Sequence, residues 1–182
     1  MQKIANEDLG RLGVDEFKSS AKCNAVLILD SVRSLNNVGS AFRTSDAFAV
    51  EHLYLAGITG TPPHREIEKS ALGATESVVW SHHPDIVDLL KDLKSKGYLL
   101  VAVEQVEGGQ SLELFQPPAH SKVAFVFGNE VFGVSDEAIA LCDIGLEVPQ
   151  FGTKHSLNIS VCIGVVLWDF MSKVGIAQLK GV

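Results

Sequence analysis

Short apolar runs alternate with stretches of helical periodicity along most of the chain. The runs are rich in Val, Leu and Ile and lie between turn-forming residues, which predicts strands. Because they are apolar on both faces and helices separate them, the pattern predicts an α/β, doubly wound fold with a mostly parallel sheet covered by helices on both sides. The predicted strands are Ala25–Leu29, His52–Ala56, Ser77–Trp80, Tyr98–Glu104, Val123–Phe127 and Gly145–Val148.

The amphipathic stretches between these runs predict the helices. Asp85 is a typical N-cap residue and Gly97 a typical C-cap residue for one of them. Residues 1 to 20 predict a short leading helix, and residues 108 to 121 an irregular connection. The remaining predicted helices are Val38–Phe48, Arg65–Leu72, Asp85–Lys96, Ser135–Cys142 and Ser156–Ser172.

Length and composition favour one domain. A chain of 182 residues with 46% hydrophobic content can bury one good core. We therefore expect a single domain over 1–182, with its core in 25–172. The longest apolar run, "SVCIGVVLWDF", is interrupted by Gly164 and Asp169 and is too short to span a bilayer. The N-terminal stretch lacks the apolar region of a secretory signal and carries acidic residues, so we expect a cytoplasmic protein without membrane contact.

Cysteine spacing and net charge narrow the possible partners. Cys23, Cys142 and Cys162 are odd in number and far apart, which indicates reduced core residues and no metal site. A formal net charge of −7 argues against indiscriminate nucleic-acid binding, whose affinity comes from cations placed on phosphates. Any RNA site must therefore be locally basic.

Parallel sheets bind ligands at the carboxyl ends of their strands, which draws attention to the loop after Asp30. It supplies Asn36, Asn37, Gly39 and Arg43 at the start of a helix, without a phosphate-binding glycine pattern. Asn37 and Arg43 are close enough along the chain to share one ligand. The alternative is that Asn37 only caps the helix and Arg43 pairs with Asp46 on the surface.

Two later loops carry further candidates. In "GNEVFGVSDE", Gly128 and Gly133 permit unusual backbone geometry, and a plain turn explains them equally well, but it explains the carboxylate of Glu130 less well. In "PQFGTKHSLNIS", Ser156 is an ordinary N-cap. Asn158, by contrast, needs a further partner, because an unpaired buried amide costs about 1–3 kcal/mol.

Taken together, "LDSVRSLNNVGSAFRTSDAFAV", "VFGNEVFGVSDEAI" and "LEVPQFGTKHSLNISV" resemble the three ordered motifs of the SpoU (TrmH-like) branch of the SPOUT methyltransferases, over about Ala25 to Phe170. The resemblance implies an S-adenosyl-L-methionine-dependent RNA ribose 2′-O-methyltransferase acting on tRNA or rRNA. It also implies a C-terminal trefoil knot and a homodimer. We expect the apolar C-terminal helix, with Val165, Trp168 and Phe170, in the dimer interface.

The resemblance also assigns residues to roles. Arg43 would clamp the phosphate next to the target ribose and stabilise developing negative charge, because a guanidinium stays protonated and is a poor base. His155 and Glu130 are the alternatives for the proton acceptor. The implied catalytic residues are Asn37, Arg43, Glu130, Ser156 and Asn158; the cofactor residues are Val103, Gly128, Val148 and Leu157; and the RNA contacts are Arg33, Arg43, His64, Arg65, Lys69 and Lys154.

Two other functions are compatible with such a sheet. A nicotinamide-dependent oxidoreductase would need a G-x-G-x-x-G turn after a strand, and the sequence contains none. A catalytically silent RNA-binding module would keep the fold while losing site residues, whereas all the motif residues are present here. For Arg65 and Lys69, a solvated helix face is an alternative to RNA contact.

Overall fold

The computed structural model describes residues 1–118 and 121–174. The predicted domain bounds therefore extend past the described part, at 175–182. Within that part, seven strands form one sheet in the order β3-β2-β1-β6-β4-β7-β5, and every pairing between neighbours is parallel. The strands are β1 (Cys23–Asp30), β2 (Val50–Ala56), β3 (Trp80–His83), β4 (Tyr98–Val103), β5 (Gln110–Ser111), β6 (Lys122–Phe127) and β7 (Ile144–Glu147).

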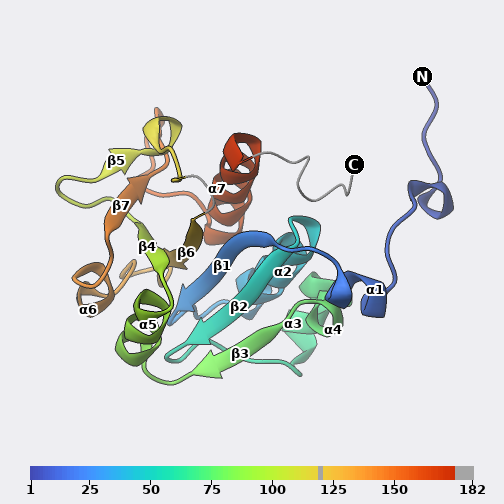
Figure 1. Ribbon diagram of the computed structural model, residues 1–182, viewed down its shortest axis with the longest axis horizontal. Coiled ribbons are helices and arrows are strands. Elements are labelled where there is room, and N and C mark those ends of the chain that lie inside the picture. The colour runs from blue at the N-terminus through green and yellow to red at the C-terminus, as the bar shows by residue number, and fades with distance from the viewer. Residues whose placement is uncertain (119–120, 175–182) are drawn as a thin grey trace.

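Helices cover both faces of the sheet, as the apolar runs predicted. Along β1, Leu27 and Leu29 pack toward one set of helices, while Val26 and Ile28 pack toward the other. Figure 1 shows α5 and α6 on one side of the molecule and the remaining large helices on the other. The first face carries α2 (Leu35–Ala47), α3 (Arg65–Ala71), α4 (Ala74–Ser77) and α7 (Ile159–Val174), and the second carries α5 (Ile86–Ser95) and α6 (Asp136–Ile139).

Local sequence explains where several helices begin and end. The side chain of Asp85 accepts hydrogen bonds from the amides of Val87 and Asp88, at 2.8 and 3.1 Å, which confirms it as the N-cap of α5. Gly97 follows that helix with φ +81°, a conformation that glycine adopts without strain. In α2, a Cβ on Gly39 would lie 2.3 Å from the carbonyl oxygen of Ile67. Gly39 therefore allows α2 and α3 to approach closely.

The start of the chain and one strand differ from the prediction. In place of one leading helix there are a 3₁₀ turn, η1 (Asn6–Leu9), and a short helix, α1 (Val14–Ser19), because Gly10 turns the chain with φ 59°. The strand predicted at Ser77–Trp80 is β3, three residues later, because Ser77 ends α4 with its hydroxyl donating to Asp46 and to the carbonyl of Ala74.

Two further predictions were wrong, one about residues 108–121 and one about the start of the last helix. The connection predicted to be irregular contains β5 and a 3₁₀ turn, η2 (Leu112–Leu114), because the edge of β7 offers β5 a partner. The last helix begins at Ile159 and not at Ser156. Its cap is Asn158, whose side-chain oxygen accepts from the Ser160 amide at 2.9 Å and whose carbonyl accepts from Val161 and Cys162. In the described residues, no helix is long and apolar enough to cross a membrane.

Candidate functional site

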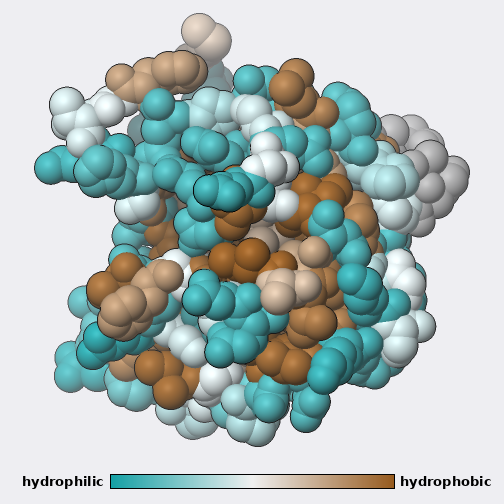
Figure 2. Space-filling model, turned by 90° about the vertical axis from the view of Figure 1, so that its left-hand side faces the viewer, coloured by the Kyte–Doolittle hydropathy of each residue, from teal (hydrophilic) through white to brown (hydrophobic). Residues whose placement is uncertain are grey.

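Three loops meet at the carboxyl ends of β1, β6 and β7. Figure 1 shows the arrowheads of β1, β2 and β3 pointing toward the left of the view, and Figure 2 presents the molecule from that side. On this face, hydrophobic surface gathers in the middle and hydrophilic surface surrounds it (Figure 2). The loops that meet here are Ser31–Ser34, Gly128–Ser135 and Val148–Asn158.

Glu130 joins two of these loops. Its Oε1 atom accepts hydrogen bonds from the Ser34 amide at 3.0 Å and from Nδ2 of Asn37 at 2.9 Å. Its Oε2 atom accepts from the Arg33 amide at 3.0 Å. Partial burial by itself would raise the pKa of Glu130, but these hydrogen bonds outweigh it and hold the pKa below the ordinary value. The lowered pKa makes Glu130 a weak base, and three donors already occupy its carboxylate, which argues against its being the proton acceptor.

Asn158 adds the third loop to this network. Its Nδ2 donates to Oδ1 of Asn37 at 3.3 Å, so the amide of Asn37 accepts from Asn158 and donates to Glu130. The N-cap of α2 is Ser34, whose hydroxyl accepts from the Asn37 amide at 3.3 Å. Asn37 is thus not the cap, and its side chain serves the network. We call Asn37, Glu130 and Asn158 the loop network.

A cavity of about 470 Å³ lies beside the loop network. All four predicted cofactor residues line it, as do three of the predicted catalytic residues. Its lining combines apolar side chains with three carboxylates, and no lysine or arginine occurs among the described residues that line it. That set suits a ligand with an apolar ring and positive charge, and opposes an anionic dinucleotide. The predicted residues here are Val103, Gly128, Val148, Leu157, Glu130, Ser156 and Asn158, and the carboxylates are Glu104, Glu130 and Glu147.

Gly128 and Gly133, the two glycines of the β6 loop, are each required for a different structural reason. A Cβ on Gly128 would lie 2.0 Å from the backbone nitrogen of Val134, so the loop folds back on itself too closely for any side chain. Gly133 has φ +72°, and a Cβ there would meet Oε2 of Glu104 at 2.2 Å. Gly128 therefore serves backbone packing, and the unusual φ belongs to Gly133 alone.

Arg43 lies away from this cavity. It is exposed on α2 and lines a separate hollow of about 880 Å³, together with Arg11, Asp46 and Trp168. The alternative ion pair with Asp46 is absent from the described residues. The structure therefore brings Asn37, Glu130, Ser156 and Asn158 together but leaves Arg43 outside the group.

The predicted RNA contacts are exposed, on loops or on helices α2 and α3. The Arg33 side chain is exposed while its amide holds Glu130, and His64 caps α3 by accepting from the Glu66 amide at 3.2 Å. Arg65, Lys69 and Lys154 are also exposed. No ion pair forms with them in the part of the chain that the structure describes.

Sequence reasoning missed four polar residues that hold the loops. Buried Asn129 donates from Nδ2 to the Ser31 carbonyl at 2.7 Å, and Oδ2 of buried Asp30 accepts from the Ser135 amide at 2.9 Å. Thr59 accepts from the Val32 amide and donates to the Leu29 carbonyl. Glu104 accepts from the Val134 amide at 3.1 Å. The available signal was position, since Asp30 ends a strand and Asn129 precedes Glu130.

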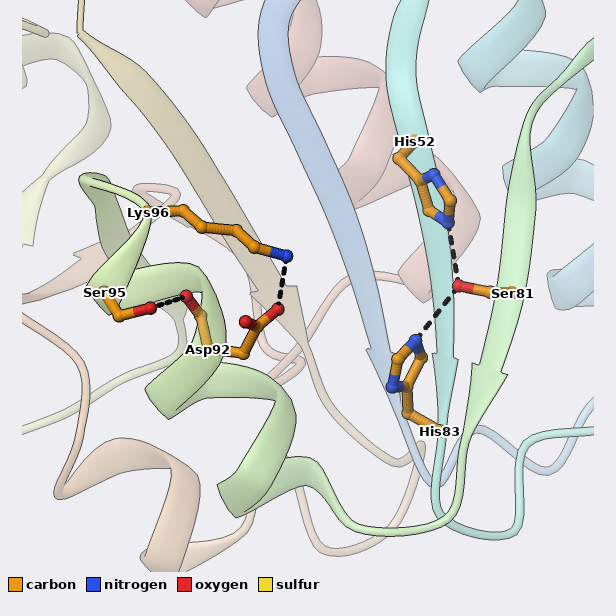
Figure 3. Close-up of polar contacts among 6 residues, drawn as sticks. All are labelled: His52, Ser81, His83, Asp92, Ser95 and Lys96. Carbon is orange, nitrogen blue, oxygen red and sulfur yellow. Dashed lines mark hydrogen bonds and ion pairs between the residues drawn. The ribbon is translucent and has the colours of Figure 1, made fainter.

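A second polar group lies on the flank of the sheet. The Ser81 hydroxyl on β3 lies between Nε2 of His52, at 2.8 Å, and Nε2 of His83, at 3.0 Å (Figure 3). The ring of Tyr54 stacks on His52 with centroids 4.1 Å apart. Burial, and then the nearby His83, lower the pKa of His52 to about 4. We call His52, Ser81 and His83 the flank cluster.

Near the flank cluster, the Lys96 ammonium pairs with Asp92 of α5 at 2.7 Å (Figure 3). Among the described residues, no group of three or more His, Cys, Asp or Glu side chains is placed to hold a metal ion.

The profile of the SpoU rRNA Methylase family matches residues 24–168. The chain belongs to this family. The tRNA (guanosine(18)-2′-O)-methyltransferase of Thermus thermophilus is 29% identical over 160 residues, which are 87% of this chain and 80% of that protein. Residues 24–168, which the family profile matches, contain all three loops of the site.

Solved structures of RNA-modifying enzymes share the fold. The A. aeolicus TrmH/SpoU tRNA modifying enzyme superposes with a TM-score of 0.80 at 23% identity, covering 91% of this chain and 83% of its own. An AdoMet-bound rRNA methyltransferase from Sinorhizobium meliloti superposes with a TM-score of 0.77 at 22% identity, covering 86% and 59%. The predicted α/β fold class is confirmed, while the trefoil knot stays a prediction.

Proposed function

We propose that this protein transfers the methyl group of S-adenosylmethionine to a ribose 2′-hydroxyl of tRNA or rRNA. The observation that carries the proposal is the loop network, which joins three loops of a SpoU family chain at the mouth of an acid-lined cavity. Since RNA is the substrate, we expect the protein in the cytoplasm.

The cavity residues fit the cofactor. Val103, Val148 and Leu157 offer apolar surface for a purine ring, and Gly128 lines the cavity beside them. Glu104 and Glu147 supply acceptors for hydroxyl and ammonium groups. When bound, adenosylmethionine supplies a methyl group that is already activated for transfer. The carboxylates also disfavour the nicotinamide alternative, because its pyrophosphate would meet like charge.

The residues of the loop network position the RNA. The amides of Asn37 and Asn158 lie between the β1 and β7 loops, and Glu130 fixes the first of them. Such preorganised groups align the 2′-hydroxyl for attack and lower the barrier without reorganisation. His155 stays the alternative proton acceptor. It lies on an exposed loop, and its backbone carbonyl accepts from Nε2 of Gln105 at 3.0 Å.

We further propose a homodimer in which the partner supplies Arg43. On the outer face of α7, Val161, Val165 and Trp168 are 53, 39 and 59% exposed, which is unusual for apolar residues on one helix face. Phe170, which was expected in the interface, is instead buried in the core against Phe125. Arg43 lines the hollow beside Trp168 and not its own cavity. Pairing through α7 gives Arg43 a route to the other protomer's site.

Subunit mixing tests the dimer proposal. Arg43→Ala and Asn158→Ala proteins, each inactive alone, should regain activity when they are mixed and allowed to exchange subunits, since one site of each mixed dimer is then intact. No recovery in mixed dimers that have been isolated through two different affinity tags would show that Arg43 acts within its own chain.

Mapping RNA tests the function itself. In total RNA from a strain lacking the gene, we expect one or more 2′-O-methyl groups of the parent strain to be missing. The purified protein with labelled adenosylmethionine should restore them. RNA binding without any methyl transfer would instead identify a silent RNA-binding module. If neither the RNA nor the cofactor is bound, the proposal is wrong.

A further inference from the structure

Phe132 is a large apolar side chain held in solvent at the mouth of the cavity. It is 82% exposed and lines the cavity with Glu130, Ser156 and Asn158. Its neighbour Val131 is 70% exposed. An aromatic ring left outside the core on a cavity rim is typical of a binding surface.

The backbone beneath this ring is fixed. Asn129 and Gly133 exchange two amide-to-carbonyl hydrogen bonds of 2.9 Å each, which close the loop. Oδ1 of Asn129 accepts from the amides of Val131, at 2.9 Å, and Phe132, at 3.2 Å. Nδ2 of the same side chain donates to the Ser31 carbonyl on the β1 loop. The ring is therefore exposed because the loop holds it there, not because the loop is loose.

The position of Phe132 matches the geometry of a nucleotide. Its Cα lies two residues from that of Glu130, so the two are at most about 7 Å apart. In RNA, the base is attached to the ribose carbon next to the one that carries the 2′-hydroxyl. A ribose aligned at the loop network therefore carries its base to the distance of the cavity rim.

We propose that Phe132 stacks on the base of the nucleotide whose ribose is methylated. The inference rests on the proposed function. A flat ring binds any base through its face, without reading hydrogen-bonding edges. Stacking on Phe132 replaces the neighbours that the base loses on leaving its helix, so the device favours an unpaired or easily unpaired target.

Substitutions that vary the ring test the proposal. Phe132→Tyr and Phe132→Trp should keep kcat/KM within about threefold of the parent, measured on RNA extracted from a strain lacking the gene, because both retain a flat face. Phe132→Leu keeps apolar bulk without a flat ring and should lower kcat/KM at least about tenfold. Leu114→Ala, at an apolar residue that is 69% exposed but does not line the cavity, is the matched control and should change it less than twofold.

Two controls separate stacking from a structural role. Phe132→Leu should bind S-adenosylhomocysteine as tightly as the parent by calorimetry and should sediment as the parent does. If Phe132→Leu is as active as the parent, the proposal is wrong. A loss of cofactor binding, or a change in the oligomeric state, would show instead that Phe132 supports the fold or contacts a second copy.

A short RNA with an abasic ribose at the mapped target gives the sharpest test. The parent should lose activity on it by about the factor that Phe132→Leu loses on normal RNA, and Phe132→Leu should lose little more, because both changes remove the same contact. If the loss from the abasic ribose and the loss from Phe132→Leu multiply when the two changes are combined, the proposal is wrong. An inactive parent on normal RNA would instead remove the proposed function.

Discussion

The loop network and the flank cluster are two groups of hydrogen-bonded polar side chains on one sheet, with different surroundings. In the loop network, Glu130 accepts hydrogen bonds from two backbone amides of the β1 loop and from the side chain of Asn37 at the start of α2, beside a cavity. In the flank cluster, Ser81 and two histidines bond to one another across β2 and β3, against Tyr54. Hydrogen bonding among polar side chains thus does not by itself identify a functional site. The loop network is identified as one because loops from the ends of several strands meet there beside a cavity.

Removing Arg43 should have the largest effect and would show whether this residue belongs with the loop network. Arg43→Ala should lower the single-turnover methylation rate by about 10²–10³, the usual loss for one preorganised charged donor. Arg43→Lys should not rescue it, because an ammonium lacks the planar two-pronged geometry. Cofactor affinity should stay within a few-fold, since Arg43 does not line the cavity. A variant that keeps more than about a tenth of the parent rate would exclude the proposed role.

Neutralising Glu130 should have the next largest effect. Glu130→Gln keeps the shape but loses the charge that three donors share, and hydrogen bonds to charged groups contribute about 1.5–3 kcal/mol. We expect kcat to fall about 10- to 100-fold. Ser81→Ala in the flank cluster is the matched control and should leave kcat unchanged. Equal losses in the two variants would erase the distinction between the two groups.

Salt should weaken RNA binding with a shallow slope. With a net charge of −7, the protein places only a few cations on phosphates, and the candidates Arg33, Arg65, Lys69 and Lys154 are all exposed. We expect about three to five phosphate contacts from a plot of log binding constant against log salt. A slope that implies about ten contacts, or none, would contradict the loop assignment.

The flank cluster should affect the free energy of unfolding and not the rate of methyl transfer. The pKa of His52 is lowered to about 4 in the folded protein, so the unfolded chain binds the proton more readily. The stability that His52 contributes is therefore present above its unfolded pKa, about 6.5, and is lost as pH falls toward 4. Urea unfolding from pH 7 to 4 should show a steeper loss for the parent than for His52→Gln. Parallel curves would mean that His52 is not buried as described.

The sequence predicted the sheet and most of its helices because continuous apolar runs such as "AVLILD" leave few alternatives. Motif order predicted which loops hold the site. The start of β3 was not predictable, because its two histidines and its serine break the apolar pattern of an edge strand. Nor was the cap of α7, since Ser156 and Asn158 are both good caps and tertiary contacts decide between them.

The placement of Arg43 shows most clearly what could not be predicted from the sequence. Six residues from Asn37, it was expected to share that residue's ligand, but the turn of α2 carries it to the hollow beside Trp168. Spacing along a helix gives the angle between two side chains, whereas the neighbouring helix decides which surface each one faces. Only the packed structure contains that information.

The clamp at Asn129 has a consequence for how this protein can change. One amide side chain satisfies the backbone of the β6 loop and ties it to the β1 loop, so neither Val131 nor Phe132 is needed through its side chain to hold the turn. A substitution at Phe132 therefore changes the contact with the RNA base and leaves the backbone that carries Glu130 in place.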